Sequence, residues 1–281
     1  MLRAIDEFIR KADRVPSIPA QVSSLLQTMS SPVSSVLEIE AMIAADTTLS
    51  ARILRLANSA FYYRMAPVTR IRDALTRLGF KTTRSMVVTV WTQSLRAFKH
   101  NLREAAIVSM LLNHGTSCAV IAKAICEVVN RERAEDVFLA ALLHDLGRIV
   151  LAFQLGDSYV ADVLFVADRA ERATCDVEEE MLGLNHAKLG GRLMEAWRLP
   201  RLFEEAARGH HDEVRPKDTA PELAAVMLAD IWATELGHNL APHALRPSPD
   251  GLIEMLALPH PEELKELCKD KIATMMDIFE I

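Results

Sequence analysis

Apolar residues recur along this chain with the period of an α-helix and only rarely with the alternation of a β-strand. In the first segment, Ile5, Phe8, Ile9 and Ala12 have the i, i+3, i+4, i+7 spacing of an amphipathic helix. Strand-like alternation of valine and threonine is almost confined to residues 86–91. The pattern therefore predicts an all-α, multi-helical protein.

Turn and capping residues separate the predicted helices. Pro16 and Pro19 interrupt the chain after the first helix, Asp46 suits the N-cap of a later helix, and Gly79 suits the end of another. The predicted helices cover residues 5–12, 22–29, 36–45, 47–57, 71–78, 80–95, 102–129, 135–153, 176–181, 186–197, 200–210, 221–236 and 261–279.

A polar stretch, Lys99–Glu104, lies between two apolar blocks and marks the expected domain boundary. We expect an N-terminal helical subdomain over residues 1–104, a second helical subdomain over 105–246, and a tail helix within 247–281. The apolar residues of the tail have near-helical spacing. The tail is therefore either a closing helix docked on the protein, which we favour, or a self-association helix that would make a homo-oligomer.

Composition excludes several classes of protein. The chain has 281 residues, half of them apolar, and a net charge of −6, which argues against nucleic-acid binding by bulk positive charge. No uninterrupted apolar run approaches the roughly 18–20 residues that cross a bilayer, and the N-terminus lacks a signal peptide's apolar stretch. The four cysteines include no Cys-x-x-Cys pair, so we expect structural thiols. These features indicate a cytoplasmic protein without a membrane partner.

Positive charge is concentrated in residues 52–84, which carry eight basic side chains and one acidic side chain. The candidate partner-binding residues in and around this segment are Arg52, Arg55, Tyr62, Tyr63 and Arg77. A solvated basic face that complements the acidic remainder of the molecule is one interpretation. An acidic signalling protein or a nucleotide is another, and nucleic acid is the least favoured because aromatic side chains are few.

Histidine and aspartate form the most informative set of candidate site residues. They are His114, His144, Asp145, His186, His210, His211 and Asp230. An aspartate in so apolar a segment is expensive to bury unless it is paired or bound to a metal. Imidazoles and carboxylates together suit iron, manganese, zinc or nickel. Asp145, with two oxygens, could bridge two ions, although any one of these histidines could instead be an ordinary hydrogen-bonded core residue.

The order of these residues resembles the metal-ligand series of the HD superfamily of metal-dependent phosphohydrolases. The N-terminal half is similar to the bacterial HDOD domain, a helical signalling module, in the segments Val15–Val22, Ile43–Ser59 and Ile71–Gly79. The resemblance spans roughly residues 13–236. It implies an HD-like helical bundle packed against an N-terminal helical subdomain.

The same resemblance implies a centre for two divalent transition-metal ions. By position, His114, His144, Asp145 and Asp230 would hold one ion, and the second would bind to Asp145, His186, His210 and His211. Iron or manganese is favoured, with zinc or nickel as alternatives. Arg148 replaces the lysine that usually follows the His-Asp pair, and the Gly-Tyr-Pro motif of two-metal relatives is absent after His211.

Two functions follow as expectations. The first is a regulatory signalling module that acts through contacts with a partner protein. The alternative is a phosphohydrolase or phosphodiesterase that acts on a nucleotide-type substrate, in which Arg148 would bind a phosphate oxygen. In that reaction His210, His211 or Glu213 could protonate the leaving group, and the sequence does not choose among them.

Overall fold

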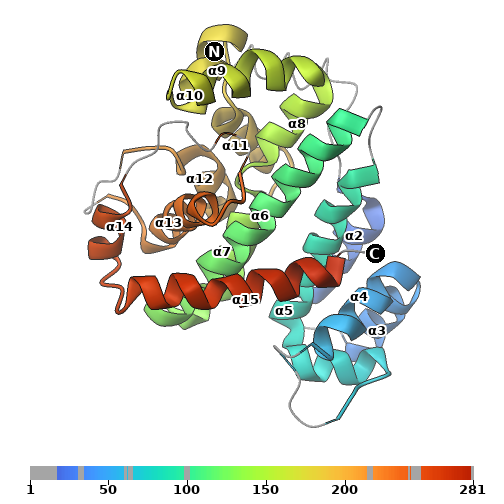
Figure 1. Cartoon of the computed structure of the whole chain (residues 1–281). Coiled ribbons are helices and arrows are strands. Elements are labelled where there is room, and N and C mark those ends of the chain that lie inside the picture. Colours follow the sequence, from blue (N-terminus) through green and yellow to red (C-terminus); the bar gives the residue numbers. More distant parts are fainter. Residues whose placement is uncertain are drawn as a thin grey trace. The chain divides into compact units, whose positions relative to one another are not determined.

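The computed structural model describes residues 18–30, 35–59, 62, 66–97, 102–213, 218–239, 241 and 248–279 (Figure 1). Every regular element in these ranges is a helix, so the all-α prediction is confirmed. The helix predicted over residues 5–12 lies outside the described residues. Arg96–Lys269 belongs to the larger of two compact units, and Ser17–Leu95 with Asp270–Ile281 belongs to the smaller.

Among the described residues, four complete helices belong to the smaller unit: α2 (Ala20–Ser30), α3 (Val36–Ala44), α4 (Thr47–Ala57) and α5 (Ile71–Ser94). Asp46 Oδ1 accepts a hydrogen bond from the backbone N–H of Leu49 at 2.9 Å, so the predicted N-cap of α4 is confirmed. At Gly79 the backbone of α5 leaves the helical conformation, with φ 75° and ψ 165°. Glycine adopts this conformation readily because it has no Cβ, and the predicted separation of two helical segments is confirmed.

The core of the smaller unit is formed by the apolar faces of these helices and by the end of the chain. Ile39, Ile43 and Ile53 are almost completely buried in it, and Ile278 and Phe279 are part of the same cluster. Ile278 and Phe279 lie in the last turn of α15 (Pro261–Phe279). The C-terminal end of the tail helix is therefore docked in a core.

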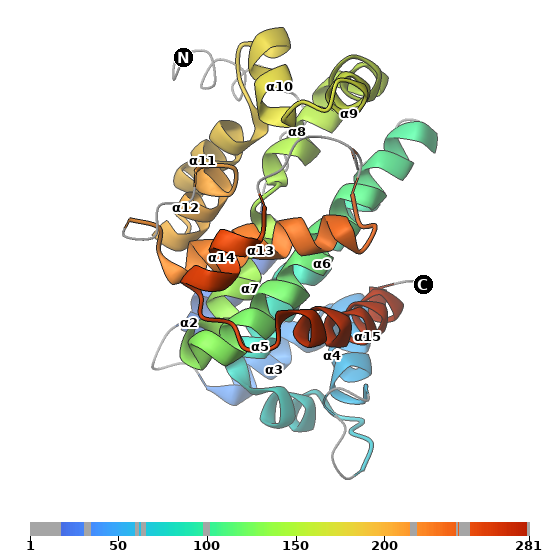
Figure 2. The same ribbon diagram turned by 60° about the vertical axis from the view of Figure 1, so that its left-hand side comes forward.

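The larger unit is built around α6 (Leu102–Val129), the longest helix in the described chain. Its other α-helices, besides the first part of α15, are α7 (Ala134–Leu143), α8 (Leu146–Leu155), α9 (Phe165–Arg169), α10 (Thr174–Leu182), α11 (His186–Ala196), α12 (Arg201–Gly209), α13 (Pro221–Glu235) and α14 (Asp250–Met255). Shorter elements are the 3-10 turns η1 (Leu95–Ala97) and η2 (Arg131–Arg133) and the π-helix η3 (Tyr159–Leu164). Helices α7 and α13 pack on α6, and α11 packs on α8 and α12 (Figure 2).

One predicted helix, residues 135–153, is wrong. The chain forms two helices there, α7 and α8, which are separated by His144 and Asp145. The backbone of Asp145 is non-helical, with φ −98° and ψ 15°. Apolar residues continue on both sides of the break because both helices are buried, so the hydrophobic pattern carries no mark of the change in direction.

Helix α6 is strongly apolar, although polar residues interrupt it and no continuous apolar run in it approaches the length of a membrane span. The segment Ala105–Val129 is long and apolar enough to cross a membrane by length and composition. However, 72% of its most apolar window is buried inside the protein, and α7 and α13 pack on it. The apolar composition of α6 is therefore accounted for by its position as the central helix of the larger unit.

Candidate metal centre

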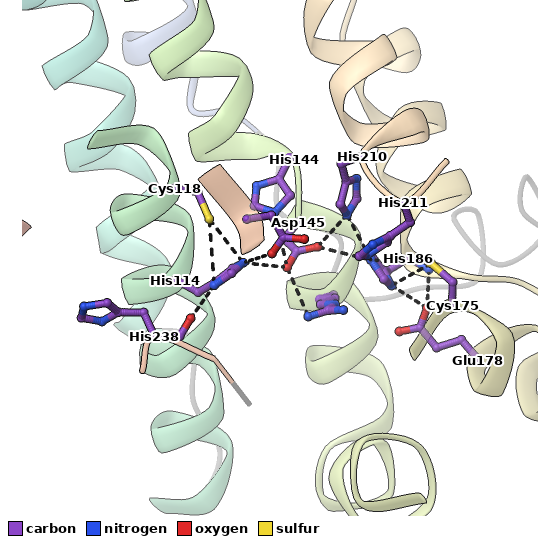
Figure 3. Close-up of polar contacts among 12 residues, drawn as sticks. His114, Cys118, His144, Asp145, Cys175, Glu178, His186, His210, His211 and His238 are labelled. Carbon is purple, nitrogen blue, oxygen red and sulfur yellow. Dashed lines mark hydrogen bonds and ion pairs between the residues drawn. The ribbon is translucent and has the colours of Figure 1, made fainter. Parts of the chain in front are cut away.

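The structure brings all seven predicted histidine and aspartate ligands together inside the larger unit (Figure 3). His114 lies on α6 and Asp230 on α13, while His144 and Asp145 form the break between α7 and α8. His186 is the first residue of α11, and His210 and His211 directly follow α12. Six of the seven are buried, none of them more than 5% exposed, and His211 is partly buried.

Glycines let the helices that carry these ligands approach one another closely. A Cβ at Gly147 would lie 2.0 Å from the backbone oxygen of His186, and a Cβ at Gly115 would lie 2.9 Å from the backbone oxygen of Leu142. No side chain larger than hydrogen fits at the first position without moving the backbone. Gly115 follows His114 directly, and Gly147 lies two residues after Asp145, so the close approaches occur next to the ligands.

The first group of candidate ligands consists of His114, Cys118, His144 and Asp230. His114 Nε2 lies 3.1 Å from Asp230 Oδ1 and 3.4 Å from Cys118 Sγ. One ligand atom from each of the four residues lies within 4.8 Å of every other. Such a separation allows all four atoms to bind one ion.

The second group consists of Asp145, His186, His210 and His211. Asp145 Oδ1 lies 3.3 Å from the Nε2 atoms of both His186 and His210. His186 Nε2 lies 3.0 Å from His211 Nε2 and 3.3 Å from His210 Nε2. Nitrogen and oxygen are therefore the only donor atoms that this group offers.

Asp145 lies between the two groups (Figure 3). While Oδ1 faces the second group, Oδ2 lies 3.7 Å from both His114 Nε2 and His144 Nε2 in the first. Each oxygen of one carboxylate is thus directed to a different set of imidazoles. This is the arrangement expected of a carboxylate that bridges two cations.

Hydrogen bonds at Nδ1 set the tautomer of four of the five imidazoles. Nδ1 of His114 donates to the backbone oxygen of His238 at 2.5 Å, and Nδ1 of His144 donates to that of Ala141 at 2.6 Å. His210 Nδ1 donates to the backbone oxygen of Ala207 at 3.0 Å. A carbonyl oxygen only accepts hydrogen bonds, so the proton of each neutral ring is at Nδ1 and the Nε2 lone pair faces the cluster.

His186 is oriented in the same way by a carboxylate. Its Nδ1 donates to Glu178 Oε2 at 2.6 Å, and its backbone N–H donates to the same oxygen at 2.7 Å. Tyr159, on the π-helix η3, donates its hydroxyl hydrogen to Glu178 Oε1 at 2.5 Å. A carboxylate behind a histidine is typical of metal ligands because it fixes the ring and makes Nε2 more basic.

In these tautomers the Nε2 lone pairs face one another. Such an arrangement is unfavourable without a cation between the nitrogens, so it shows whether the residues suit a metal. In the second group, the Nε2 atoms of His186 and His210 and an oxygen of Asp145 approach within 3.3 Å, and none of these three atoms carries a proton when both rings are in the neutral tautomers described above. In the first, His144 Nε2 is completely buried and has no hydrogen-bond partner among the described residues. A cation would satisfy all of these atoms, so the donor set fits a metal centre.

The charges around the centre favour an ionised Asp145. Burial opposes ionisation, but the guanidinium of Arg148, with Nη1 3.4 Å from Asp145 Oδ2, holds the pKa of that carboxyl well below its usual value. Burial also lowers the pKa of His144 to about 4. Arg148 is itself buried, so this predicted phosphate-binding residue lies within the cluster and faces a carboxylate.

Three residues of the centre were not predicted from the sequence. Cys118, expected to be a structural thiol, lies beside His114, and its spacing of four residues on a predicted helix could have revealed it. Glu178 and Tyr159 carry no such signal. They reach His186 through the packing of separate elements, which the sequence pattern does not report.

The predicted partner-binding residues are not one exposed set. Tyr62 is partly buried and packs on the core of the smaller unit. Arg77 donates hydrogen bonds to the backbone oxygens of Ala57 and Ala66, at 3.0 and 2.6 Å. The guanidinium of Arg52 lies 5.2 Å from the centre of the Phe279 ring. Of the other two residues, Arg55 is exposed and Tyr63 lies outside the described residues.

Fold and centre together define a class: helical proteins whose interior holds a cluster of histidine and aspartate residues suited to metal. Residues 15–213 match the HDOD domain family, and the chain belongs to this family. The family resemblance predicted from the sequence is thereby confirmed.

Proteins from several bacteria are similar to this chain in structure or in sequence. An HDOD domain protein of unknown function from Geobacter sulfurreducens is 26% identical, with 99% of this chain and 95% of that chain covered and a TM-score of 0.76. A candidate metal-dependent phosphohydrolase from Shewanella amazonensis is 18% identical, with 99% of each chain covered and a TM-score of 0.70. An uncharacterised protein of Treponema pallidum is 21% identical over 223 residues, which are 79% of this chain. The chain spans only 42% of that relative's length.

Proposed function

We propose that this chain is a cytoplasmic regulatory module whose HD-like unit holds two divalent transition-metal ions and which acts through protein contacts. The position of Asp145 carries the proposal, because its two carboxylate oxygens face two different groups of imidazoles. His114, His144 and Asp230 would hold one ion, and His186, His210 and His211 the other. Asp145 would be shared between them.

Burial of the ligands favours regulation over catalysis. A phosphoester undergoing hydrolysis has to contact the ions directly, whereas His144 and His186 are completely buried and Asp145 is 4% exposed. Arg148, the expected phosphate anchor, is buried against Asp145. The ligands of this enclosed centre lie on or beside α6, α8, α11, α12 and α13. Binding or loss of metal would therefore change how these helices pack, as a regulatory role requires.

Hydrolysis of a phosphoester is the second candidate function, and the full set of ligands supports it. Two bound cations would supply Lewis acidity and an activated water. For this chain's own residues, Arg148 would bind a non-bridging phosphate oxygen after turning from Asp145, and His211, the least buried ligand, would lie nearest to an entering substrate. The Shewanella amazonensis protein, described as a candidate metal-dependent phosphohydrolase, is consistent with this alternative.

Elemental analysis of protein purified without chelator or affinity metal tests the centre. We expect close to two equivalents of transition metal per chain, favouring iron or manganese and with zinc or nickel as alternatives. The Asp145→Ala variant should lose both ions because both groups share this residue. Full metal content in that variant would refute the two-metal centre.

The two functions are separated by an activity assay on the metal-loaded protein. The regulatory proposal expects no turnover of bis(p-nitrophenyl) phosphate above that of the Asp145→Ala variant. If the wild type hydrolyses this substrate and the Asp145→Ala variant does not, the phosphohydrolase alternative replaces the regulatory proposal.

Partner binding is tested separately with the Arg55→Glu variant. Arg55 is chosen because it is exposed, whereas Arg77 is hydrogen-bonded within the fold.

A further inference from the structure

The two groups of ligands differ in chemistry, because only the first contains sulfur. Cys118 lies one helical turn after His114 on α6, so both side chains project from the same face of this helix. Cys118 Sγ lies 3.4 Å from His114 Nε2, and both residues are buried. Figure 3 shows the sulfur directed to the His114 ring.

We propose that Cys118 is a thiolate ligand of the first ion, so that the two ions are held by chemically unequal sites. The inference rests on the proposed metal centre and adds a fifth ligand to the four proposed for its first ion, which are His114, His144, Asp230 and the shared Asp145. Binding replaces the S–H bond with a metal–sulfur bond, and the released proton passes to solvent. A metal-bound thiol loses its proton readily because the cation stabilises the thiolate.

Distances in the first group fit this assignment. Zinc binds sulfur at about 2.3 Å and nitrogen or oxygen at about 2.0–2.1 Å, so at ligand angles of about 90–120° a sulfur and a nitrogen lie about 3.1–3.8 Å apart, and a nitrogen and an oxygen about 2.9–3.6 Å apart. The corresponding separations are 3.4 Å from Cys118 Sγ to His114 Nε2 and 3.1 Å from His114 Nε2 to Asp230 Oδ1. Independent support comes from His144 Nε2, a completely buried donor atom of the same group without a hydrogen-bond partner among the described residues.

A second cysteine near the centre is not equivalent. Cys175 Sγ lies 3.8 Å from His186 Nδ1 and 3.9 Å from His186 Nε2. Nδ1 of this ring donates to Glu178, and Nε2 faces Asp145 and the other histidines of the second group. Cys175 is grouped only with Glu178 and His186, and not with the Asp145, His210 and His211 ligand atoms of the second group, so we assign it no ligand role.

Ligand softness predicts how the two sites differ. Thiolate selects zinc and other borderline or soft ions, whereas manganese prefers oxygen and nitrogen donors. In the presence of a chelator, the first site should therefore retain zinc or Co²⁺ longer than the second site does. Manganese should compete well with zinc only at the second site. Removal of a single supporting residue behind a metal ligand weakens binding about 10–100-fold, and loss of Cys118 should weaken the first site at least as much.

Titration of the metal-free full-length protein with Co²⁺ tests the assignment. A Co²⁺–thiolate bond gives a charge-transfer absorption in the near ultraviolet, which nitrogen and oxygen ligands do not produce. We expect this absorption in the wild type, its loss in Cys118→Ser, and its retention in Cys175→Ser and in Cys126→Ser, a matched control at a buried cysteine on the same helix. Loss in Cys175→Ser with retention in Cys118→Ser would overturn the proposal.

X-ray absorption of the zinc-loaded wild type keeps the test independent of whether the variant folds. One sulfur neighbour per two zinc ions, at about 2.3 Å, is expected. Two bound ions without any sulfur neighbour would refute the role of Cys118 and leave the two-metal centre intact. Failure of the wild type to bind zinc or Co²⁺ at all would refute both.

Discussion

Glu178 offers the sharpest test of how the second group of ligands is organised. One of its oxygens, Oε2, accepts hydrogen bonds from both Nδ1 and the backbone N–H of His186, at 2.6 and 2.7 Å. Burial opposes its ionisation, but the neighbouring imidazole of His186 lowers the pKa of Glu178 below its usual value. The substitution Glu178→Gln keeps the shape of this side chain and removes its negative charge.

The expected effect is a weaker second metal site in an unchanged fold. A glutamine oxygen can still accept from His186 while its amide group faces the Tyr159 hydroxyl, so both hydrogen-bonding positions stay occupied. The neutral acceptor makes His186 Nε2 less basic. Loss of such a supporting carboxylate weakens metal binding about 10–100-fold, which corresponds to about 1.4–2.7 kcal/mol. The first group contains no ligand in contact with Glu178 and should keep its affinity.

Competition between the protein and a chromophoric chelator for Zn²⁺ measures the two affinities. Glu178→Gln should weaken one of two binding steps, and Glu180→Gln is the matched control because Glu180 is an exposed acid on the same helix, paired with Arg172. If Glu178→Gln binds both ions as the wild type does while His186→Ala loses one, the carboxylate does not tune this ligand. The reasoning from hydrogen-bond geometry would then be refuted.

Three further predictions concern stability, each measured by urea unfolding. Gly147→Ala should lower the free energy of unfolding by about 3 kcal/mol or more, because its Cβ would lie 2.0 Å from a backbone oxygen at the start of α11. Gly251→Ala is the control, because its Cβ would meet no atom within 4 Å. Equal stability of the two variants would contradict the close approach of the two helices at Gly147. Metal-free protein should lose stability as the pH falls from about 6.5 toward 4, because the pKa of His144 is lowered to about 4 by burial whereas the unfolded chain binds the proton near 6.5. This group accounts for up to about 3 kcal/mol, and a His144→Asn variant with the same pH dependence would exclude it as the cause. Arg77→Ala should lower the free energy of unfolding by about 1–3 kcal/mol, because two backbone oxygens lose their hydrogen-bond donor. An equal loss in Arg55→Ala would show that the positive charge, and not these hydrogen bonds, accounts for the effect.

Local signals in the sequence were sufficient for most of the helices. The apolar period predicted α6 over residues 102–129, and the residue types at Asp46 and Gly79 predicted a helix start and a helix break that the structure contains. These features depend on interactions between neighbours along the chain, such as capping and backbone conformation. A short-range pattern is enough to report them.

The members of the candidate centre were also predictable, but the reason was chemical. Histidine and aspartate are unusual in segments as apolar as those around Asp145 and Asp230, so their presence indicates paired or metal-bound side chains. Which of them lie together was inferred from a family resemblance. The structure groups them in nearly the same way, with Cys118 added to the first group and Asp145 between the two.

The support and orientation of these residues come from contacts between helices that are distant in the sequence. The break at His144 and Asp145 lies inside a continuous apolar segment, because the helices on both sides are buried and neither face is marked by polar residues. Glu178 reaches His186 from α10, and the carbonyl that orients His114 comes from His238, 124 residues further along the chain. Contacts of this kind depend on which helices pack together, and the period of apolar residues specifies a buried face without specifying its partner. Local patterns therefore specified most of the helices and the histidine and aspartate ligands, and the packing of the helices specified how these ligands are oriented and supported.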